Sequence, residues 1–156
     1  PMTPYRYFKD KDEILAAVCI RAFDRFSDAL ETARANATGS AMERSSAVGN
    51  AYIAFAFANP HAYRLMFDMT WGQEHKYPDV KRATDRARKT MTAHLTPLIE
   101  QGVLIGDPQL IGHAYWALLH GAIELKLAGK LTAEQDFDAI ITDALTALTR
   151  GYSPKD

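Results

Sequence analysis

The first fifteen residues contain side chains that could contact nucleic acid. Within nine residues the chain places hydrogen-bond donors at Thr3, Tyr5, Arg6, Tyr7 and Lys11. Phosphate groups are bound by such donors gathered on one surface, and a helix beginning at Lys11 would add amide N–H groups and a favourable dipole. The pattern therefore predicts a DNA-contacting surface. The tyrosines could instead form an aromatic cluster at the edge of a domain.

A second group of polar residues has the spacing of one helix face. His113, Trp116, His120 and Glu124 recur at intervals of three and four. Histidine and carboxylate side chains on one face can bind a metal. However, no HExxH or CxxC motif accompanies them, so we expect His120 to hydrogen-bond a backbone or carboxylate group and Trp116 to pack in the core. We predict no metal and no cofactor.

Nothing in the sequence has the spacing of a nucleophile with its base, and no glycine-rich phosphate loop is present. We therefore predict that the protein is not an enzyme. A small helical enzyme using His94, His113 or His120 stays open as an alternative.

The composition limits the class of protein. The 156 residues are 47% hydrophobic, which suffices for one core. With 18 basic and 19 acidic residues, the net charge of -1 argues against a wholly basic nucleic-acid-binding protein but permits a local basic patch. The single cysteine, Cys19, excludes an internal disulfide and fits a reducing compartment. No run of 18 apolar residues predicts a membrane span, and no signal peptide is recognisable, so we expect a cytoplasmic protein that does not contact a membrane.

The elements that position these residues are predicted to be helices throughout. Apolar and polar residues do not alternate as in a strand, whereas helix caps and stops are frequent. Asp10, Asn59, Asp79 and Asp107 are predicted N-caps, and Thr132 begins a stretch with capping-box spacing. Pro97 should break the helix that contains it near Thr96. The expected helices span about 11–35, 41–58, 60–67, 79–101, 108–128 and 132–150. On the first of them, spacings of three and four predict one apolar stripe that faces the core: Ile14, Leu15, Val18, Cys19, Ala22, Phe23, Phe26 and Leu30.

The N-terminal stretch resembles a known family of regulators. Its pattern T-x-Y-x-Y-F-x-x-K-x-x-I/L is similar to the end of the recognition helix and the start of the next helix in tetracycline-repressor-like (TetR) proteins. The resemblance implies that Thr3, Tyr5 and Lys11 contact DNA phosphates or base edges, with Tyr7 near the backbone and Phe8 structural. Pro4 departs from the aliphatic residue usual in the family. Residues 1–12 would be the C-terminal remnant of a helix-turn-helix domain, and we expect the rest of that domain upstream of Pro1.

The C-terminal half carries a second resemblance. Trp116-Ala-Leu-Leu-His120-Gly121 and the segment Ala56–Phe67 are similar to signatures of one TetR C-terminal domain group. The resemblance implies that residues 13–156 form a ligand-binding and dimerisation domain. It also implies a homodimer with two-fold symmetry, in which the last two helices form a four-helix bundle with their copies. The residues expected at that interface are Leu110, Ala114, Ala117, Leu118, Gly121, Leu125, Ile141, Leu145 and Leu148. The same seam could instead be core within one chain.

The middle helices supply a candidate effector pocket of aromatic and methionine side chains with a few polar tips. Such a lining suits a flat or flexible apolar ligand. The candidates are Tyr52, Phe55, Tyr63, Met66, Phe67, Met69, Trp71, Met91, His94, Leu95, Trp116 and His120. Taken singly, each of them fits ordinary core better than a ligand contact, so only the whole set points to a pocket.

Taken together, these features predict an all-α protein with a partial helix-turn-helix head and a helical sensing body. The family resemblance implies a transcriptional regulator, most often a repressor, that binds double-stranded operator DNA as a homodimer. An effector in the body would move the helix Lys11–Arg34 and release the operator. The alternative is a helical small-molecule-binding protein with no role on DNA.

Overall fold

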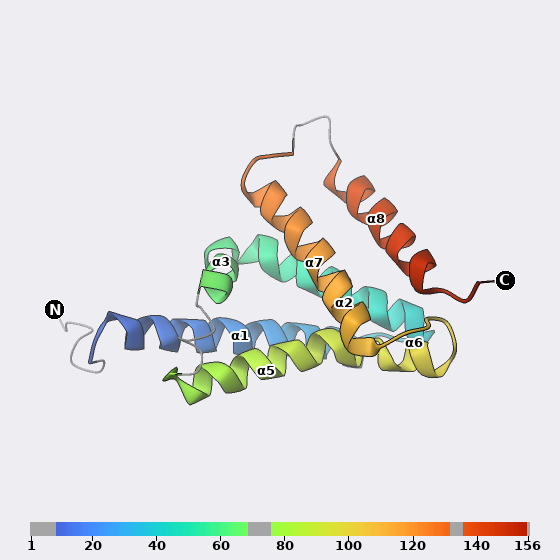
Figure 1. Cartoon of the computed structure of the whole chain (residues 1–156). Coiled ribbons are helices and arrows are strands. Elements are labelled where there is room, and N and C mark those ends of the chain that lie inside the picture. The colour runs from blue at the N-terminus through green and yellow to red at the C-terminus, as the bar shows by residue number, and fades with distance from the viewer. Residues whose placement is uncertain (1–8, 69–75, 132–135, 156) are drawn as a thin grey trace.

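The computed structural model describes residues 9–68, 76–131 and 136–155, and within these ranges the chain forms helices and no strands (Figure 1). The helices are α1 (Lys11–Asn36), α2 (Ala41–Ala58), α3 (Pro60–Asp68), α5 (Pro78–Ala93), α6 (Thr96–Glu100), α7 (Pro108–Leu127) and α8 (Phe137–Tyr152). The predicted all-α fold is confirmed. No helix in the described part of the chain is long and apolar enough to cross a membrane.

Long helices pack around a main core. α1 packs along α5 and α2, and Figure 1 shows α1 and α5 side by side, with α7 rising at a steep angle from the end of α5. Phe26 of α1 contacts Tyr52 and Phe55 of α2 edge to face, with ring centroids 5.1 and 5.3 Å apart. α8 lies beside α7 on the far side of the molecule from α1. Buried residues of α1, α2, α3, α5, α7 and α8 together form this core.

Most of these helices begin at a capping residue that the local sequence supplies. Asp10 and Asp107 accept hydrogen bonds from the first-turn amides of α1 and α7, as predicted. Ser40 and Glu43 form a reciprocal capping box at α2. Asp136 caps α8, whereas the capping-box residues predicted from Thr132 lie outside the described residues.

Two predicted N-caps are wrong. The Asn59 side chain donates to the carbonyl of Phe55, so it serves the end of α2 rather than the start of α3. Its carbonyl oxygen is taken by Arg25 of α1 at 3.1 Å. α5 begins at Pro78, which places Asp79 inside the first turn, and the N-cap residue Tyr77 makes no side-chain cap bond.

The predicted break at Pro97 is confirmed. α5 ends at Ala93, and α6 begins at Thr96 after one turn. Proline has no N–H for the bond to residue 93 and its ring crowds that carbonyl, so the helix cannot continue through it. The break lets the chain turn into a second, smaller core formed by Ala41, Leu95, Leu98, Leu104 and Ile111.

One residue of the predicted apolar stripe on α1 is not covered. Val18 is 46% exposed, although it was expected to face the core with Cys19, Phe23 and Phe26. Ala16 is buried instead, against Cys19 and Val80. The buried face of α1 is thus shifted by a fraction of a turn near its start, because α5 covers it there.

Candidate ligand site in the helical body

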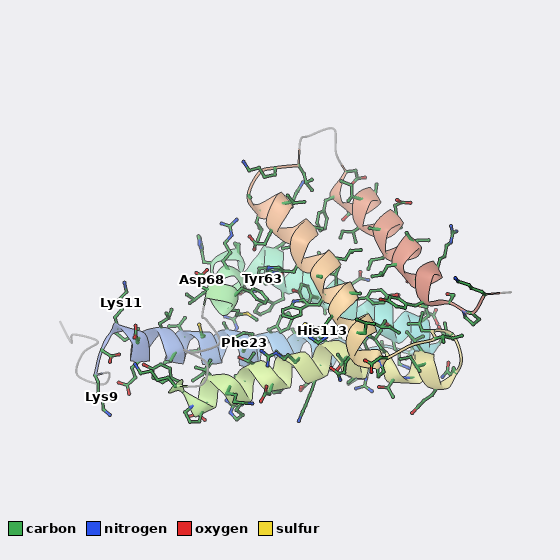
Figure 2. The ribbon with its side chains drawn as sticks, in the orientation of Figure 1. Lys9, Lys11, Phe23, Tyr63, Asp68 and His113 are labelled. Atoms are coloured by element: carbon green, nitrogen blue, oxygen red, sulfur yellow. The ribbon has the colours of Figure 1, made fainter. Side chains whose placement is uncertain are left out.

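A chain of four hydrogen-bonded side chains crosses the middle of the core. The indole Nε1 of Trp116 donates to the Tyr52 hydroxyl at 3.1 Å. The Tyr52 and Tyr63 hydroxyl oxygens are 2.8 Å apart, and the Tyr63 oxygen is 2.7 Å from Nδ1 of His120. These residues come from α2, α3 and α7, so the chain ties three helices together (Figure 2 labels Tyr63).

Counting donors gives the direction of the hydrogen bonds that satisfies all the donors of these side chains. Trp116 can only donate, so the Tyr52 oxygen accepts from it and Tyr52 gives its own proton to Tyr63. Tyr63 then donates to Nδ1 of His120, which must be the acceptor. If Tyr63 donated to Tyr52 instead, the hydroxyl hydrogen of Tyr52 would have no partner among these four side chains. His120 accordingly carries its proton on Nε2.

The environment keeps this chain neutral. Burial raises the pKa of Tyr52 to about 12 and raises the pKa of Tyr63 above its usual value. Burial lowers the pKa of His120, against an opposing effect of the nearby Glu124 carboxylate. His120 was expected to bond a backbone or carboxylate group, and its partner is instead the Tyr63 phenol. The polar groups of Tyr52, Tyr63, Trp116 and His120 are therefore hydrogen-bonded to one another.

Next to this chain lies a cavity of about 100 Å³. Its volume is somewhat below that of apolar protein cavities, of roughly 150 Å³, that bind benzene. The hydroxyl of Thr84 donates to the carbonyl of Val80, so it offers the cavity only acceptor capacity. The residues that line the cavity are Phe23, Phe26, Met66, Phe67, Thr84, Ala87, Arg88, Met91 and Trp116. A ligand much larger than one ring requires the surrounding helices to move.

The structure brings together part of the predicted pocket. Met66, Phe67, Met91 and Trp116 line the cavity, and Tyr52, Tyr63 and His120 form the adjacent chain. Phe55 is buried against Phe26, and Leu95 belongs to the second core. His94 lines a different cleft, beyond the second core. Met69 and Trp71 lie outside the described residues.

Sequence reasoning missed the contribution of α1 to the cavity. Phe23 and Phe26 were assigned only to the core stripe of that helix, and Ala87 and Arg88 of α5 were not considered. The only signal was an aromatic pair three residues apart on a long helix. That spacing shows that both rings share a face but does not show that a space lies beside them.

Ion pairs lock α1 to α5 along the outer side of the cavity. Arg86 contacts Asp28 and Glu31 at 2.6 Å each, and Arg82 pairs with Asp24 at 3.1 Å. The Arg82 hydrogen bond holds the pKa of the Asp24 carboxyl below its usual value. Because these pairs are partly exposed, each contributes little alone, but the group restrains the two helices as a unit.

The predicted DNA-contacting residues are only partly described. Thr3, Tyr5, Arg6 and Tyr7 lie outside the described residues, and Lys11 is exposed in the first turn of α1 (Figure 2). The amide groups at this helix start are less available than expected. Asp10 accepts from the Glu13 amide, and Glu13 accepts from the Lys9 amide. Carboxylates therefore already occupy part of the position expected to receive a phosphate.

The predicted dimer seam divides into two sets. Leu110, Ala117, Gly121 and Leu125 of α7 are exposed on the described chain, whereas Ala114, Leu118, Leu145 and Leu148 are half-buried. Ile141 is only 5% exposed and belongs to the core of its own chain. A Cβ added at Gly121 would meet nothing within 4 Å. The exposed set forms an open apolar strip on α7.

The described residues thus form an all-helical body with a mostly apolar cavity beside Trp116. The profile of the family described as "Tetracyclin repressor-like, C-terminal domain" matches residues 45–148, from α2 into α8. The chain belongs to this tetracycline-repressor-like family. The comparison with curated proteins gave no match.

Two solved structures extend the likeness to α1. A protein of unknown function from Rhodococcus sp. RHA1 is 27% identical, with a TM-score of 0.84, over 97% of this chain and 77% of that one. The TetR family transcriptional regulator PfmR from Thermus thermophilus is 19% identical, with a TM-score of 0.69, over 97% of this chain and 81% of that one. The latter likeness shows the shared fold. Membership of the tetracycline-repressor-like family supports a role in transcriptional regulation.

Proposed function

We propose that this protein is a ligand-responsive transcriptional regulator, most simply a repressor that releases operator DNA when a small apolar or aromatic effector enters the cavity beside Trp116. Residues 1–12 would close the DNA-binding domain, and residues 13–156 would sense the effector and form the homodimer. Such a regulator would act in the cytoplasm and would have no catalytic activity.

The observation that carries this proposal is that α1 forms a wall of the cavity. Phe23 and Phe26 line it, and the same helix begins at Lys11, which is the last of the residues proposed to contact DNA. At about 100 Å³ the cavity is too small for most effectors without movement of its walls. An effector that displaces Phe23 or Phe26 would therefore displace α1 and, through it, the DNA-contacting end.

The ion pairs between α1 and α5 support this coupling. Arg86 and Arg82 hold α5 to α1, so both helices would shift together when the cavity opens. A ligand shifts such an equilibrium only by its difference in affinity between the two arrangements. The proposal thus requires an effector that fits the opened cavity better than the closed one.

DNA binding is tested first, with full-length protein and operator sites selected from a random DNA pool. We expect a palindromic site, because a two-fold dimer presents two equivalent heads. Lys11→Ala and Tyr5→Phe should weaken binding to that site at low salt. Lys9→Ala is the matched control, since it removes an equal charge two residues away. Equal losses in the two lysine variants would show general charge attraction and remove Lys11 from the contact set.

Effector response is tested on the selected operator. A library of small aromatic compounds is screened for release of the DNA, and Phe26→Ala, which enlarges the cavity, should change the response without changing the selected sequence. If a compound saturates the cavity and the operator affinity stays the same, the proposed mechanism is wrong. If full-length protein selects no site, the alternative of a ligand-binding protein without a DNA role is favoured. The carboxylates at the start of α1 are the feature that agrees with that alternative.

A further inference from the structure

A second and larger cleft lies between α2, α7 and α8. Its volume is about 440 Å³, within the range of small-molecule sites, and it opens to the surface on one side. It shares no lining residue with the cavity beside Trp116. Met42, Leu98 and Leu145 form its apolar interior, next to the second core.

The cleft is held open by contacts at both ends of α8. At the start of the helix, Phe137 is buried and packs edge to face on Phe57 of α2, with centroids 5.1 Å apart. At its end, the carbonyl of Tyr152 accepts a hydrogen bond of 2.7 Å from the Ile105 amide. α8 is thus attached on either side of the cleft, and the space under its middle is part of the fold.

Small side chains face one another across this space. Gly49 of α2 has nothing within 4 Å of an added Cβ, and Thr142 and Thr146 lie on the α8 side. The Thr146 hydroxyl donates to the Thr142 carbonyl at 2.7 Å, so it is fixed as an acceptor. The inner wall is closed by Ser45, whose hydroxyl lies 2.8 Å from Nδ1 of His94.

The rim carries polar groups that have no partner in the described parts of the chain. The side chains of Ser46, Asn50 and Arg150 make no hydrogen bond or ion pair there. Of the described residues lining the cleft, none carries a carboxylate, and burial lowers the pKa of His94 to about 4. At pH 7 Arg150 is therefore the lining residue that is charged, and it lies at the mouth of an apolar space.

We infer that this cleft is a second ligand site that binds a small organic acid, with the apolar part of the ligand against Leu98 and Leu145 and its carboxylate at Arg150. A guanidinium without a carboxylate partner favours an anion, and the neutral amide and hydroxyl donors beside it add hydrogen bonds. One charge at the rim and an apolar interior select a monocarboxylate with a chain or ring over a polyanion. The inference does not depend on DNA binding.

The test uses the full chain and decanoic acid as the probe, with 1-decanol as its neutral analogue, in calorimetric titrations at pH 7. We expect saturable binding of one decanoate per chain and weaker binding of decanol. Arg150→Gln should lower the decanoate affinity about tenfold, the cost of one charged hydrogen bond, and leave decanol unaffected. Equal loss for both ligands would contradict the role of Arg150.

Gly49 supplies the matched pair that locates the site. Gly49→Leu should fill the cleft and abolish binding, while Gly49→Ala should keep it, because one methyl group leaves most of the space. Both variants should stay folded, since the position is helical and unobstructed, and circular dichroism checks this. Decanoate binding that survives Gly49→Leu, or no binding to the wild-type chain at millimolar concentration, would overturn the inference.

Discussion

Tyr63 is the residue on which the polar interior depends. It accepts from Tyr52 and donates to His120, so its hydroxyl belongs to two of the three hydrogen bonds in the chain. The residue is fully buried, which makes an unsatisfied partner costly.

We therefore expect Tyr63→Phe to lower the free energy of unfolding by about 1–3 kcal/mol, because it leaves Tyr52 and His120 without their partner. Urea denaturation followed by circular dichroism measures the change. His120→Phe tests the same bond from its other end. In the double variant the two losses should be less than additive, since both remove one shared hydrogen bond. If the two losses of unfolding free energy were strictly additive, Tyr63 and His120 would not be coupled through this hydrogen bond.

His94 gives the protein a pH-dependent stability. Burial lowers its pKa to about 4, below the ordinary value of 6.5. Between these values the unfolded chain binds a proton that the folded chain does not, so stability is complete above pH 6.5 and falls as the pH decreases towards 4. The loss is roughly 3 kcal/mol at most. Thermal unfolding at pH 7, 6 and 5 should show a smaller decrease for His94→Gln than for wild type, and an equal decrease would contradict this role of His94.

At the level of elements, a close approach joins α5 to α7. A Cβ at Gly112 would lie 2.6 Å from the Thr92 Cγ2 methyl, which is shorter than real contacts allow. Gly112→Ala should therefore separate the two helices and destabilise the fold by about 1–3 kcal/mol.

Thr92→Ser provides the compensating change for Gly112→Ala. It removes the methyl group and keeps the hydroxyl that donates to the Arg88 and Lys89 carbonyls. The double variant should recover most of the lost stability in urea denaturation. Failure of Thr92→Ser to restore stability would place the strain elsewhere.

Gly49→Ala is the comparison at a helical position with no close neighbour. It should stabilise the protein, because alanine favours the helix over glycine.

The elements were largely predictable, and the site was not. Helix starts and the break before α6 depend on residues whose effect reaches no further than one helical turn: Asp10, Ser40, Asp107 and Pro97. Local chemistry is therefore sufficient to place them. Asn59 shows the limit, because the same side chain could serve either neighbouring helix and Arg25 of α1 holds it on the earlier one. Such a choice depends on tertiary packing.

The hydrogen-bonded chain joins residues that are 11, 57 and 64 positions apart in sequence. Periodicity placed Trp116 and His120 on one face of α7 but could not say which helix would face them. Cavities are less predictable still, because they depend on which side chains fail to fill a space. The small residues of α2 and α8 carried no apolar signal, so the larger cleft was not expected.

At the level of the whole molecule, the exposed strip on α7 suggests how two copies meet. Leu125 is 50% exposed on the predicted seam, and Ile105 is 60% exposed in the loop before α7, outside the predicted seam residues. If the seam forms the homodimer, Leu125→Glu should place a charge in an apolar interface and produce monomers. Ile105→Glu is the matched control and should leave the dimer intact. Light scattering after size exclusion measures both, and a dimer that tolerates Leu125→Glu would exclude this seam.

The fixed position of the Trp116 indole has a spectroscopic consequence. Its N–H is bonded to the Tyr52 phenol, and its ring lines the cavity against Phe67, with centroids 5.9 Å apart. The chain contains one other tryptophan, Trp71, so Trp71→Phe leaves Trp116 as the single indole emitter. Any molecule that enters the cavity must then alter the wavelength or lifetime of that emission. The protein thus carries its own fluorophore in the wall of the cavity where an effector is proposed to bind.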